Sequence, residues 1–263
     1  MEAAAGGAPI SRRGMLAAGI AAVVAAACGG NGGGGARVEG IGTGAAEGRL
    51  RARPGAPSQA GPAGLHPLGL ERGRDGFVYV PASYSAERPA PLAVVLHGAG
   101  GGAREALSML RPLADGAGLV LLAPDARAST WDAVAGRFGP DVAFVDRALA
   151  HVFRRWAVDP ARVAVAGFSD GASYALSLGV TNGDLFSRIV AFSPGFIAAG
   201  PRTGTPRVFV SHGTRDEVLP IDRCSRRIVP QLRRMQLDVV YREFDGPHTV
   251  PPAIAREAVE WLS

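Results

Sequence analysis

From about Gly69 to the end of the chain, short apolar runs alternate with longer segments in which apolar residues recur every three or four positions. The short runs have the length of buried strands, and the longer segments have the period of amphipathic helices. Strands that alternate with helices form parallel β-α-β units, since a parallel connection must cross the sheet. Strands are expected at 77–81, 91–98, 119–126, 162–167, 186–195, 207–214 and 238–246, and helices at 104–118, 141–158 (with Asp141 as N-cap), 170–180, 226–236 and 251–263. The sequence therefore predicts an α/β fold with an open, mostly parallel, doubly wound sheet, and a ligand site at the carboxyl ends of its strands.

Residues 1–27 indicate an export signal rather than part of the fold. Arg12 and Arg13 precede an uncharged run, 14–27, which is shorter than the about 20 residues of a spanning helix and typical of a signal peptide. The paired arginines resemble a Tat signal, and "AAAC" resembles a lipobox with Cys28 as the acylated residue, although Ala25 stands where leucine is usual. A plain cleaved signal and an uncleaved membrane anchor compete with this interpretation. We expect an exported, extracytoplasmic protein, held at the cell membrane if Cys28 is acylated.

Residues 28–68 consist mainly of Gly, Ala, Pro and Arg, so they offer little apolar surface to offset the entropy cost of ordering. They are predicted to form a flexible tether, which leaves 69–263 as the folded domain. The chain has no lysine, and its arginines are scattered rather than gathered in a stripe, so a nucleic-acid partner is not expected. The two cysteines, Cys28 and Cys224, form no metal-binding pattern, and we expect neither a metal nor a cofactor.

The stretch "VAVAGFSDGASY" (163–174) holds the pattern G-x-S-x-G, centred on Ser169. In a chain with 37 glycines this pattern alone is weak, and a serine in a surface turn would also produce it. Its position decides, because Ser169 directly follows a predicted strand and opens a predicted helix, as in a nucleophile elbow. Side chains in place of Gly167 and Gly171 would collide with neighbouring atoms in so tight a turn.

The stretch "HGAGGG" (97–102) also directly follows a predicted strand. A phosphate-binding loop would require G-x-x-x-x-G-K-[ST], which is absent. A backbone N–H that binds an oxyanion fits better, with Ala99 as the first choice of donor and Gly98 the next. The amide of Asp170 is the expected second donor, its side chain being incidental, and His97 is expected to be structural.

Two later loops place an acid and a base at strand ends. Asp216 follows the strand at 207–214 and is suited to orient a histidine, with Glu217 and Asp222 as competitors and a turn-forming role as the competing interpretation. His248 lies between the last strand and the last helix, where it can take a proton from Ser169 and return it to a leaving group.

The segments "PLAVVLHGAGG", "DPARVAVAGFSDGASYAL", "SHGTRDEVLPI" and "YREFDGPHTVPP" together resemble the α/β-hydrolase superfamily. The resemblance is to its phospholipase/carboxylesterase, dienelactone-hydrolase-like and polyhydroxybutyrate-depolymerase-like esterases. It implies a carboxylesterase that needs no cofactor and cleaves a small-molecule or polymer ester through an acyl-serine. It also implies a catalytic triad of Ser169, Asp216 and His248, with Ala99 and Asp170 forming the oxyanion hole.

The sequence leaves the substrate and the reaction partly open. Secreted depolymerases and feruloyl esterases of this branch often carry disulfides, which Cys224 alone cannot provide, so a polymer substrate is disfavoured. Transfer of the acyl group to another alcohol, and a noncatalytic tethered binding protein, also fit the pattern. The longest loop, 125–141, carries Trp131, which either lines the site or anchors the loop. No connection after Ser169 is long enough for a large lid, and an open site suits short acyl groups or bulky alcohols.

Overall fold

The computed structural model describes residues 45, 47–198 and 200–263. The chain divides into two units, Met1–Arg37 and Val38–Ser263, and the first lies outside the described residues. The predicted export signal, its arginine pair and Cys28 lie outside them too, so these remain predictions. Within the described residues, no helix is both long enough and apolar enough to cross a bilayer.

In the described part of the chain, eight strands form one sheet in the order β1-β2-β4-β3-β5-β6-β7-β8. The six strands from β3 onward run parallel. At one edge β2 pairs antiparallel with β4, and β1 pairs antiparallel with β2. This confirms the predicted fold class; β1 and the antiparallel direction of β2 were not predicted. The strands are β1 (Gly64–Pro67), β2 (Gly76–Val80), β3 (Ala90–Leu96), β4 (Val120–Pro124), β5 (Val158–Phe168), β6 (Arg188–Phe192), β7 (Arg207–Gly213) and β8 (Val239–Phe244).

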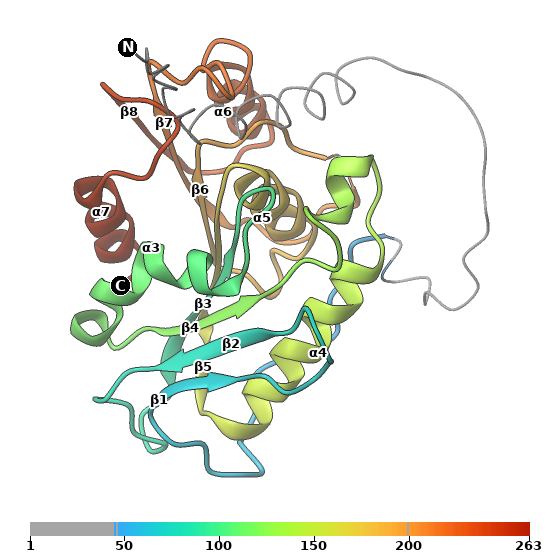
Figure 1. The fold of residues 1–263 in the computed structure, drawn as a ribbon, viewed down its shortest axis with the longest axis vertical. Helices are drawn as coiled ribbons and strands as arrows, with labels where there is room; N and C mark the ends of the chain where they lie inside the picture. The colour runs from blue at the N-terminus through green and yellow to red at the C-terminus, as the bar shows by residue number, and fades with distance from the viewer. Residues whose placement is uncertain (1–44, 46, 199) are drawn as a thin grey trace, which may run out of the picture. The chain divides into compact units, whose positions relative to one another are not determined.

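Helices cover both faces of this sheet (Figure 1). Because side chains alternate along a strand, Leu92 and Val94 of β3 enter the core under α4, α5 and α6, while Ala93 and Val95 enter the core under α3 and α7. Two hydrophobic cores therefore hold the strand ends in place from both sides. The helices are α3 (Ala103–Ala117), the 3₁₀ turn η2 (Asp132–Ala135), α4 (Pro140–Arg155), α5 (Asp170–Thr181), α6 (Ser225–Arg234) and α7 (Pro252–Leu262).

Asp141 is not the N-cap of its helix, contrary to the prediction. Gly139 holds that position and Pro140 opens α4, where its missing N–H costs nothing. Asp141 lies in the first turn, 2% exposed, and its carboxylate is left available for other partners.

The domain also begins earlier than predicted. Residues 47–68, assigned to the flexible tether, pack on the folded domain. Leu50 is 2% exposed in the main core, and its amide donates to Asn182 Oδ1 at 2.8 Å. Arg49 donates to the carbonyl oxygen of Thr181 at 2.5 Å and to Asp184 at 3.0 Å. Composition did not predict this segment, because few of its residues are large and apolar and most of its contacts with the domain are polar, such as those of the Ala52 amide with Asp146 and of Arg53 with Asp184.

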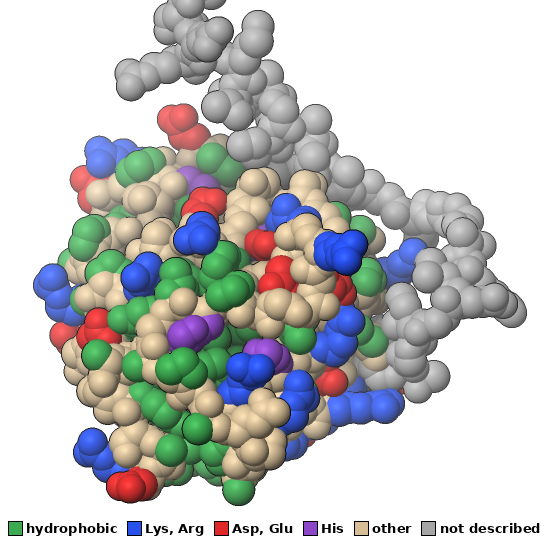
Figure 2. Space-filling model, turned by 60° about the horizontal axis from the view of Figure 1, so that its bottom comes forward, with side chains coloured by type: hydrophobic (Ala, Val, Ile, Leu, Met, Phe, Trp, Pro, Cys, Tyr) green, Lys and Arg blue, Asp and Glu red, His purple; other side chains and the backbone are tan. Residues whose placement is uncertain are grey.

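On the face drawn in Figure 2, arginine side chains are scattered among acidic and apolar ones. That face carries no continuous basic stripe of the kind that follows a nucleic-acid backbone.

Candidate active site

Ser169 lies in a strained turn between β5 and α5. Its φ is 58° and its ψ is −121°, which is a sparsely populated conformation for a residue with a side chain. A Cβ atom on Gly167 would lie closer than 3.0 Å to the carbonyl oxygen of Gly171, and one on Gly171 would lie as close to that of Leu96. Both glycines of the pattern are therefore required by backbone contacts, as the sequence predicted.

Ser169, His248 and Asp216 form a hydrogen-bonded chain across three strand ends. Ser169 Oγ lies 2.9 Å from His248 Nε2, and His248 Nδ1 lies 2.6 Å from Asp216 Oδ2. Ser169 follows β5, Asp216 follows β7, and His248 lies in the loop from β8 to α7. Asp216 is buried, whereas His248 is partly exposed, so the imidazole can reach both the acid and a bound molecule. The structure brings the three predicted side chains together; their catalytic roles remain a prediction.

The carboxylate of Asp216 has donors on both oxygens. Its Oδ1 accepts from the amides of Val218 at 3.0 Å and Leu219 at 2.8 Å, and its Oδ2 accepts from His248 at 2.6 Å and lies 3.2 Å from His212 Nε2. Burial works to raise the pKa of Asp216, but hydrogen bonds from His212, His248 and Leu219 outweigh it and hold that pKa well below the usual range. Asp216 is therefore ionised at neutral pH, and its carboxylate accepts a hydrogen bond from the Nδ1–H group of His248.

The competing acids do not take this place. Glu217 is exposed, and Asp222 forms a surface ion pair with Arg226 at 2.7 Å. His212, near the end of β7, is fully buried, with Nδ1 2.6 Å from Ser225 Oγ and Nε2 2.8 Å from the carbonyl oxygen of Leu219. These contacts hold the loop that carries Asp216 against the end of β7.

The predicted oxyanion donors lie in two different segments. Within the described residues, neither the amide of Ala99 nor that of Asp170 donates to a protein acceptor. Gly98 runs beside the nucleophile, since a Cβ placed on it would lie 3.5 Å from Ser169 Cβ. Asp170 is the first residue of α5, where the helix N-terminus favours negative charge. Both amides are thus free to bind a developing oxyanion, and that role remains a prediction.

His97 anchors the loop that carries Ala99. Its Nδ1–H donates to the carbonyl oxygen of Gly98 at 2.8 Å, and its Nε2 accepts from the amide of Ala126 at 3.0 Å. Burial lowers the pKa of His97, which keeps the ring neutral as this arrangement requires. The expectation that His97 is structural agrees with these contacts.

Trp131 anchors its loop rather than lining the site. It is 1% exposed, its Nε1–H donates to the carbonyl oxygen of His97 at 2.9 Å, and its ring stacks on Tyr174 with centroids 4.9 Å apart. Of the two roles that the sequence left open for Trp131, the structure supports the second.

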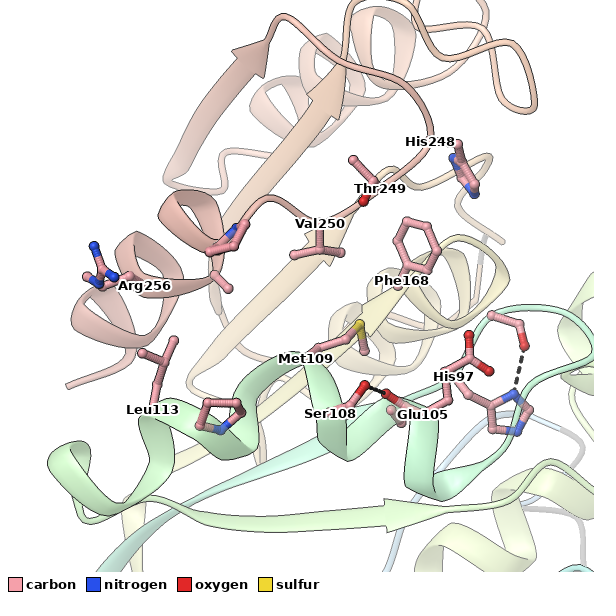
Figure 3. A pocket seen from close by; sticks show the side chains of 15 residues that line it. His97, Glu105, Ser108, Met109, Leu113, Phe168, His248, Thr249, Val250 and Arg256 are labelled. Atoms are coloured by element: carbon pink, nitrogen blue, oxygen red, sulfur yellow. Dashed lines mark hydrogen bonds between the residues drawn. The ribbon is translucent and has the colours of Figure 1, made fainter.

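A cavity of about 500 Å³ opens beside His248, between α3 and α7 (Figure 3). Its walls are largely apolar, with Met109 on α3, Phe168 before the nucleophile and Val250 before α7. Its size falls within the range of small-molecule sites. The sequence did not reveal this cavity, because its α3 side chains look like ordinary packing residues of an amphipathic helix. Within the described residues, no three His, Cys, Asp or Glu side chains are grouped so as to hold a metal ion.

Comparison with known proteins agrees with this architecture. The family described as Phospholipase/Carboxylesterase matches residues 142–261. A curated relative, probable feruloyl esterase C of Aspergillus niger, is 29% identical over 168 residues, which are 60% of this chain and 60% of that protein. This chain thus spans about 60% of the length of that relative.

Solved structures share the fold. A phospholipase/carboxylesterase from Dyadobacter fermentans is 21% identical, with a TM-score of 0.55 over 79% of this chain and 99% of that one. A CE1 ferulic acid esterase from Anaeromyces mucronatus, solved with ferulic acid, is 19% identical, with a TM-score of 0.53 over 74% of this chain and 88% of that one. At these identities the likeness shows the fold.

Proposed function

We propose that this chain hydrolyses carboxylic esters through an acyl-enzyme formed on Ser169, as the match of residues 142–261 to the family described as Phospholipase/Carboxylesterase supports. The observation that carries this proposal is the chain of hydrogen bonds from Ser169 Oγ through His248 to Asp216. It supplies a nucleophile, a base within reach of the nucleophile's proton, and an acid that orients the base.

The reaction has two halves. In the first, His248 Nε2 takes the Ser169 proton as Oγ attacks the ester carbonyl carbon, and the carbonyl oxygen becomes an oxyanion that accepts hydrogen bonds from the amides of Ala99 and Asp170. His248 then gives the proton to the departing alkoxide, which leaves as the alcohol. In the second half, His248 deprotonates a water that attacks the acyl carbon, and the acid leaves as the Ser169 hydroxyl is restored. Asp216 stabilises the imidazolium in both halves, and each oxyanion donor is expected to lower the barrier by about 3 kcal/mol.

The substrate class we propose is an ester with a short acyl group or a bulky alcohol. The largely apolar cavity lined by Phe168 and His248 supports this proposal, since it offers apolar contact area beside Ser169. A series of p-nitrophenyl esters should therefore give the highest kcat/KM at short chain lengths. A maximum at twelve carbons or more would refute this substrate class.

A second candidate is an ester of a hydroxycinnamic acid. The support for it is that the Aspergillus niger relative is named as a feruloyl esterase and the Anaeromyces mucronatus structure holds ferulic acid. An aromatic acyl group would pack on the apolar wall at Met109, Phe168 and Val250. The comparison of kcat/KM for methyl ferulate with that for methyl butyrate decides between the two, because they share an alcohol and differ in the acyl group.

The test of the reaction itself is Ser169→Ala. The wild-type protein should hydrolyse p-nitrophenyl butyrate and react with a fluorophosphonate probe, and Ser169→Ala should lose both while its melting temperature stays within a few degrees. Ser187→Ala is the matched control, because Ser187 Oγ donates to the carbonyl oxygen of Val163, in the middle of β5, at 3.3 Å and makes no hydrogen bond to the candidate triad within the described residues. Turnover retained in Ser169→Ala would overturn the mechanism.

The same assays distinguish ester hydrolysis from acyl transfer and from noncatalytic binding. A wild-type protein that does not react with the probe would favour a noncatalytic binding protein. Ester products formed in the presence of a competing alcohol would favour acyl transfer over hydrolysis.

We also propose that the chain is exported and acylated at Cys28. The paired residues Arg12 and Arg13 and the "AAAC" stretch support this. Cell fractionation of the wild type and of Cys28→Ala tests it, with loss from the membrane fraction expected for the variant.

A further inference from the structure

Residues 129–131, which we call the brace, hold both sides of the loop that carries Ala99. The carbonyl oxygen of Ser129 accepts from the amide of Gly100 at 2.7 Å. Two residues later, Trp131 donates to the carbonyl oxygen of His97 at 2.9 Å. The amide of Ala99 therefore lies between two points that the brace fixes.

The middle residue of the brace contacts the nucleophile elbow. Thr130 Oγ1 donates to Asp170 Oδ2 at 2.6 Å, and Asp170 is the residue directly after Ser169. The Asp170 carboxylate is thus not incidental, as the sequence suggested, because it ties the elbow to the brace. The two predicted oxyanion donors, Ala99 and Asp170, belong to segments after different strands, and the brace connects them.

One buried carboxylate, that of Asp141, accepts hydrogen bonds from residues on either side of the brace. Asp141 Oδ1 accepts from the amide of Arg127 at 2.6 Å, and its Oδ2 accepts from the amide of Asp132 at 2.7 Å. Asp132 Oδ2 accepts in return from the amide of Asp141 at 2.8 Å. Trp131, the last residue of the brace, is also buried and stacked on Tyr174, so that end of the brace is fixed by packing.

We propose that Thr130 is a positioning residue that sets the separation of the Ala99 and Asp170 amides through its hydrogen bond to the Asp170 carboxylate. This inference rests on the proposed ester hydrolysis at Ser169. Donors held in place before the reaction stabilise the oxyanion, which exists only after the nucleophile attacks. Loss of the Thr130 hydroxyl should therefore lower kcat and leave KM nearly unchanged.

The experiment compares Thr130→Val with Thr130→Ser. Valine keeps the shape and removes the hydroxyl, whereas serine keeps the hydroxyl. The matched control is Thr203→Val, since Thr203 Oγ1 makes comparable hydrogen bonds to Thr181 at 2.8 Å and to Asp184 at 2.6 Å, at the opposite end of α5. With p-nitrophenyl butyrate, Thr130→Val should lose kcat by about 10- to 100-fold with KM within twofold, as expected for a displaced oxyanion donor.

Three further results are expected. Thr130→Ser should recover kcat to within about threefold of wild type, and Thr203→Val should keep wild-type kcat even if its melting temperature falls. The inhibition constant of a trifluoromethyl ketone, which forms an oxyanion on the serine, should rise in Thr130→Val by the same factor as kcat/KM falls. Asp170→Ala, which keeps the backbone amide, should lose kcat similarly, and the double variant should lose no more than either single variant.

The outcomes separate this inference from the proposed function. An active wild type with Thr130→Val within twofold of its kcat would overturn the inference alone. Equal loss of kcat in Thr203→Val, or failure of Thr130→Ser to recover, would assign Thr130 a merely structural role. If Thr130→Val does not fold, the result from Asp170→Ala decides. A wild type without ester turnover or probe labelling would overturn both proposals.

Discussion

Replacing Asp216 by asparagine tests the orienting role of this acid, because the structure dictates how the new amide must lie. Asp216 Oδ1 accepts from the amides of Val218 and Leu219, while its Oδ2 accepts from His248 Nδ1. Asparagine has one acceptor oxygen and one NH₂ group. Its oxygen must face the two backbone donors, so its NH₂ group faces His248.

That orientation of the amide selects the opposite tautomer of His248. The new NH₂ group donates to His248 Nδ1, and the ring proton moves to Nε2, which then points an N–H at Ser169 Oγ and cannot accept its proton. The opposite amide orientation restores the tautomer of His248 that can accept the Ser169 proton. It leaves two backbone donors, the buried amide of Leu219 and the partly buried amide of Val218, facing an NH₂ group. At about 1–3 kcal/mol for each unsatisfied donor, the active arrangement costs about 2–6 kcal/mol. The expected loss in kcat/KM is therefore between about 30-fold and about 10⁴-fold.

The assay is kcat/KM for p-nitrophenyl butyrate, with melting temperature as the check on folding. Glu217→Gln and Asp222→Asn are the matched controls, since both remove a nearby carboxylate without touching His248, and both should stay within about threefold of wild type. The reasoning is refuted if folded Asp216→Asn stays within about tenfold of wild type, or if Glu217→Gln falls as far.

Three further predictions follow from local contacts. Gly171→Ala should lose most of its activity and some stability, because the new Cβ would lie closer than 3.0 Å to a backbone carbonyl oxygen of β3, whereas Gly116→Ala, with open space around it on α3, should melt no lower than wild type. Leu50→Ala should lower the free energy of unfolding in urea by about 2–5 kcal/mol if residues 47–68 belong to the domain, and a change below about 1 kcal/mol would contradict that. Burial, and to a smaller extent the neighbouring carboxylate of Asp141, raises the pKa of Asp132 from 3.8 to about 6. The neutral form of Asp132 therefore favours folding. This stabilisation is present below about pH 4 and is lost as the pH rises through 6. The stability of wild type relative to Asp132→Asn should therefore fall by up to about 3 kcal/mol from pH 4 to pH 7 in urea titrations; a rise would contradict this.

The parts of the fold that the sequence predicted are those stabilised by apolar side chains. The central parallel strands are fully buried and therefore appear as continuous apolar runs, and the helices show their period clearly. The sequence did not predict β1, because its four residues, GLHP, carry no apolar pattern and join the sheet through backbone hydrogen bonds. The segment 47–60 escaped for a related reason, since Leu50 and Arg49 fix it through partners about 130 residues away in the sequence.

The candidate triad was predictable because each of its members lies at, or in the loop after, the carboxyl end of a strand. In a parallel sheet the carboxyl ends of strands meet along one edge, so Ser169, Asp216 and His248 had to lie near one another once the strands were assigned. The cavity at α3 and α7 was not predictable in the same way, because it depends on how two helices from distant parts of the chain pack side by side.

Asp141 shows why the supports of a site are harder to predict than its reacting groups. An aspartate near the start of a helix ordinarily accepts from that helix's own free amides. Here Gly139 and Pro140 open the helix, and the Asp141 carboxylate instead accepts from the amides of Arg127 and Asp132, which flank the brace. The candidate nucleophile is visible in the sequence because its turn is local and requires glycines at fixed spacing. In our proposal the separation of the two expected oxyanion donors depends on a third segment, which only contacts distant in sequence reveal.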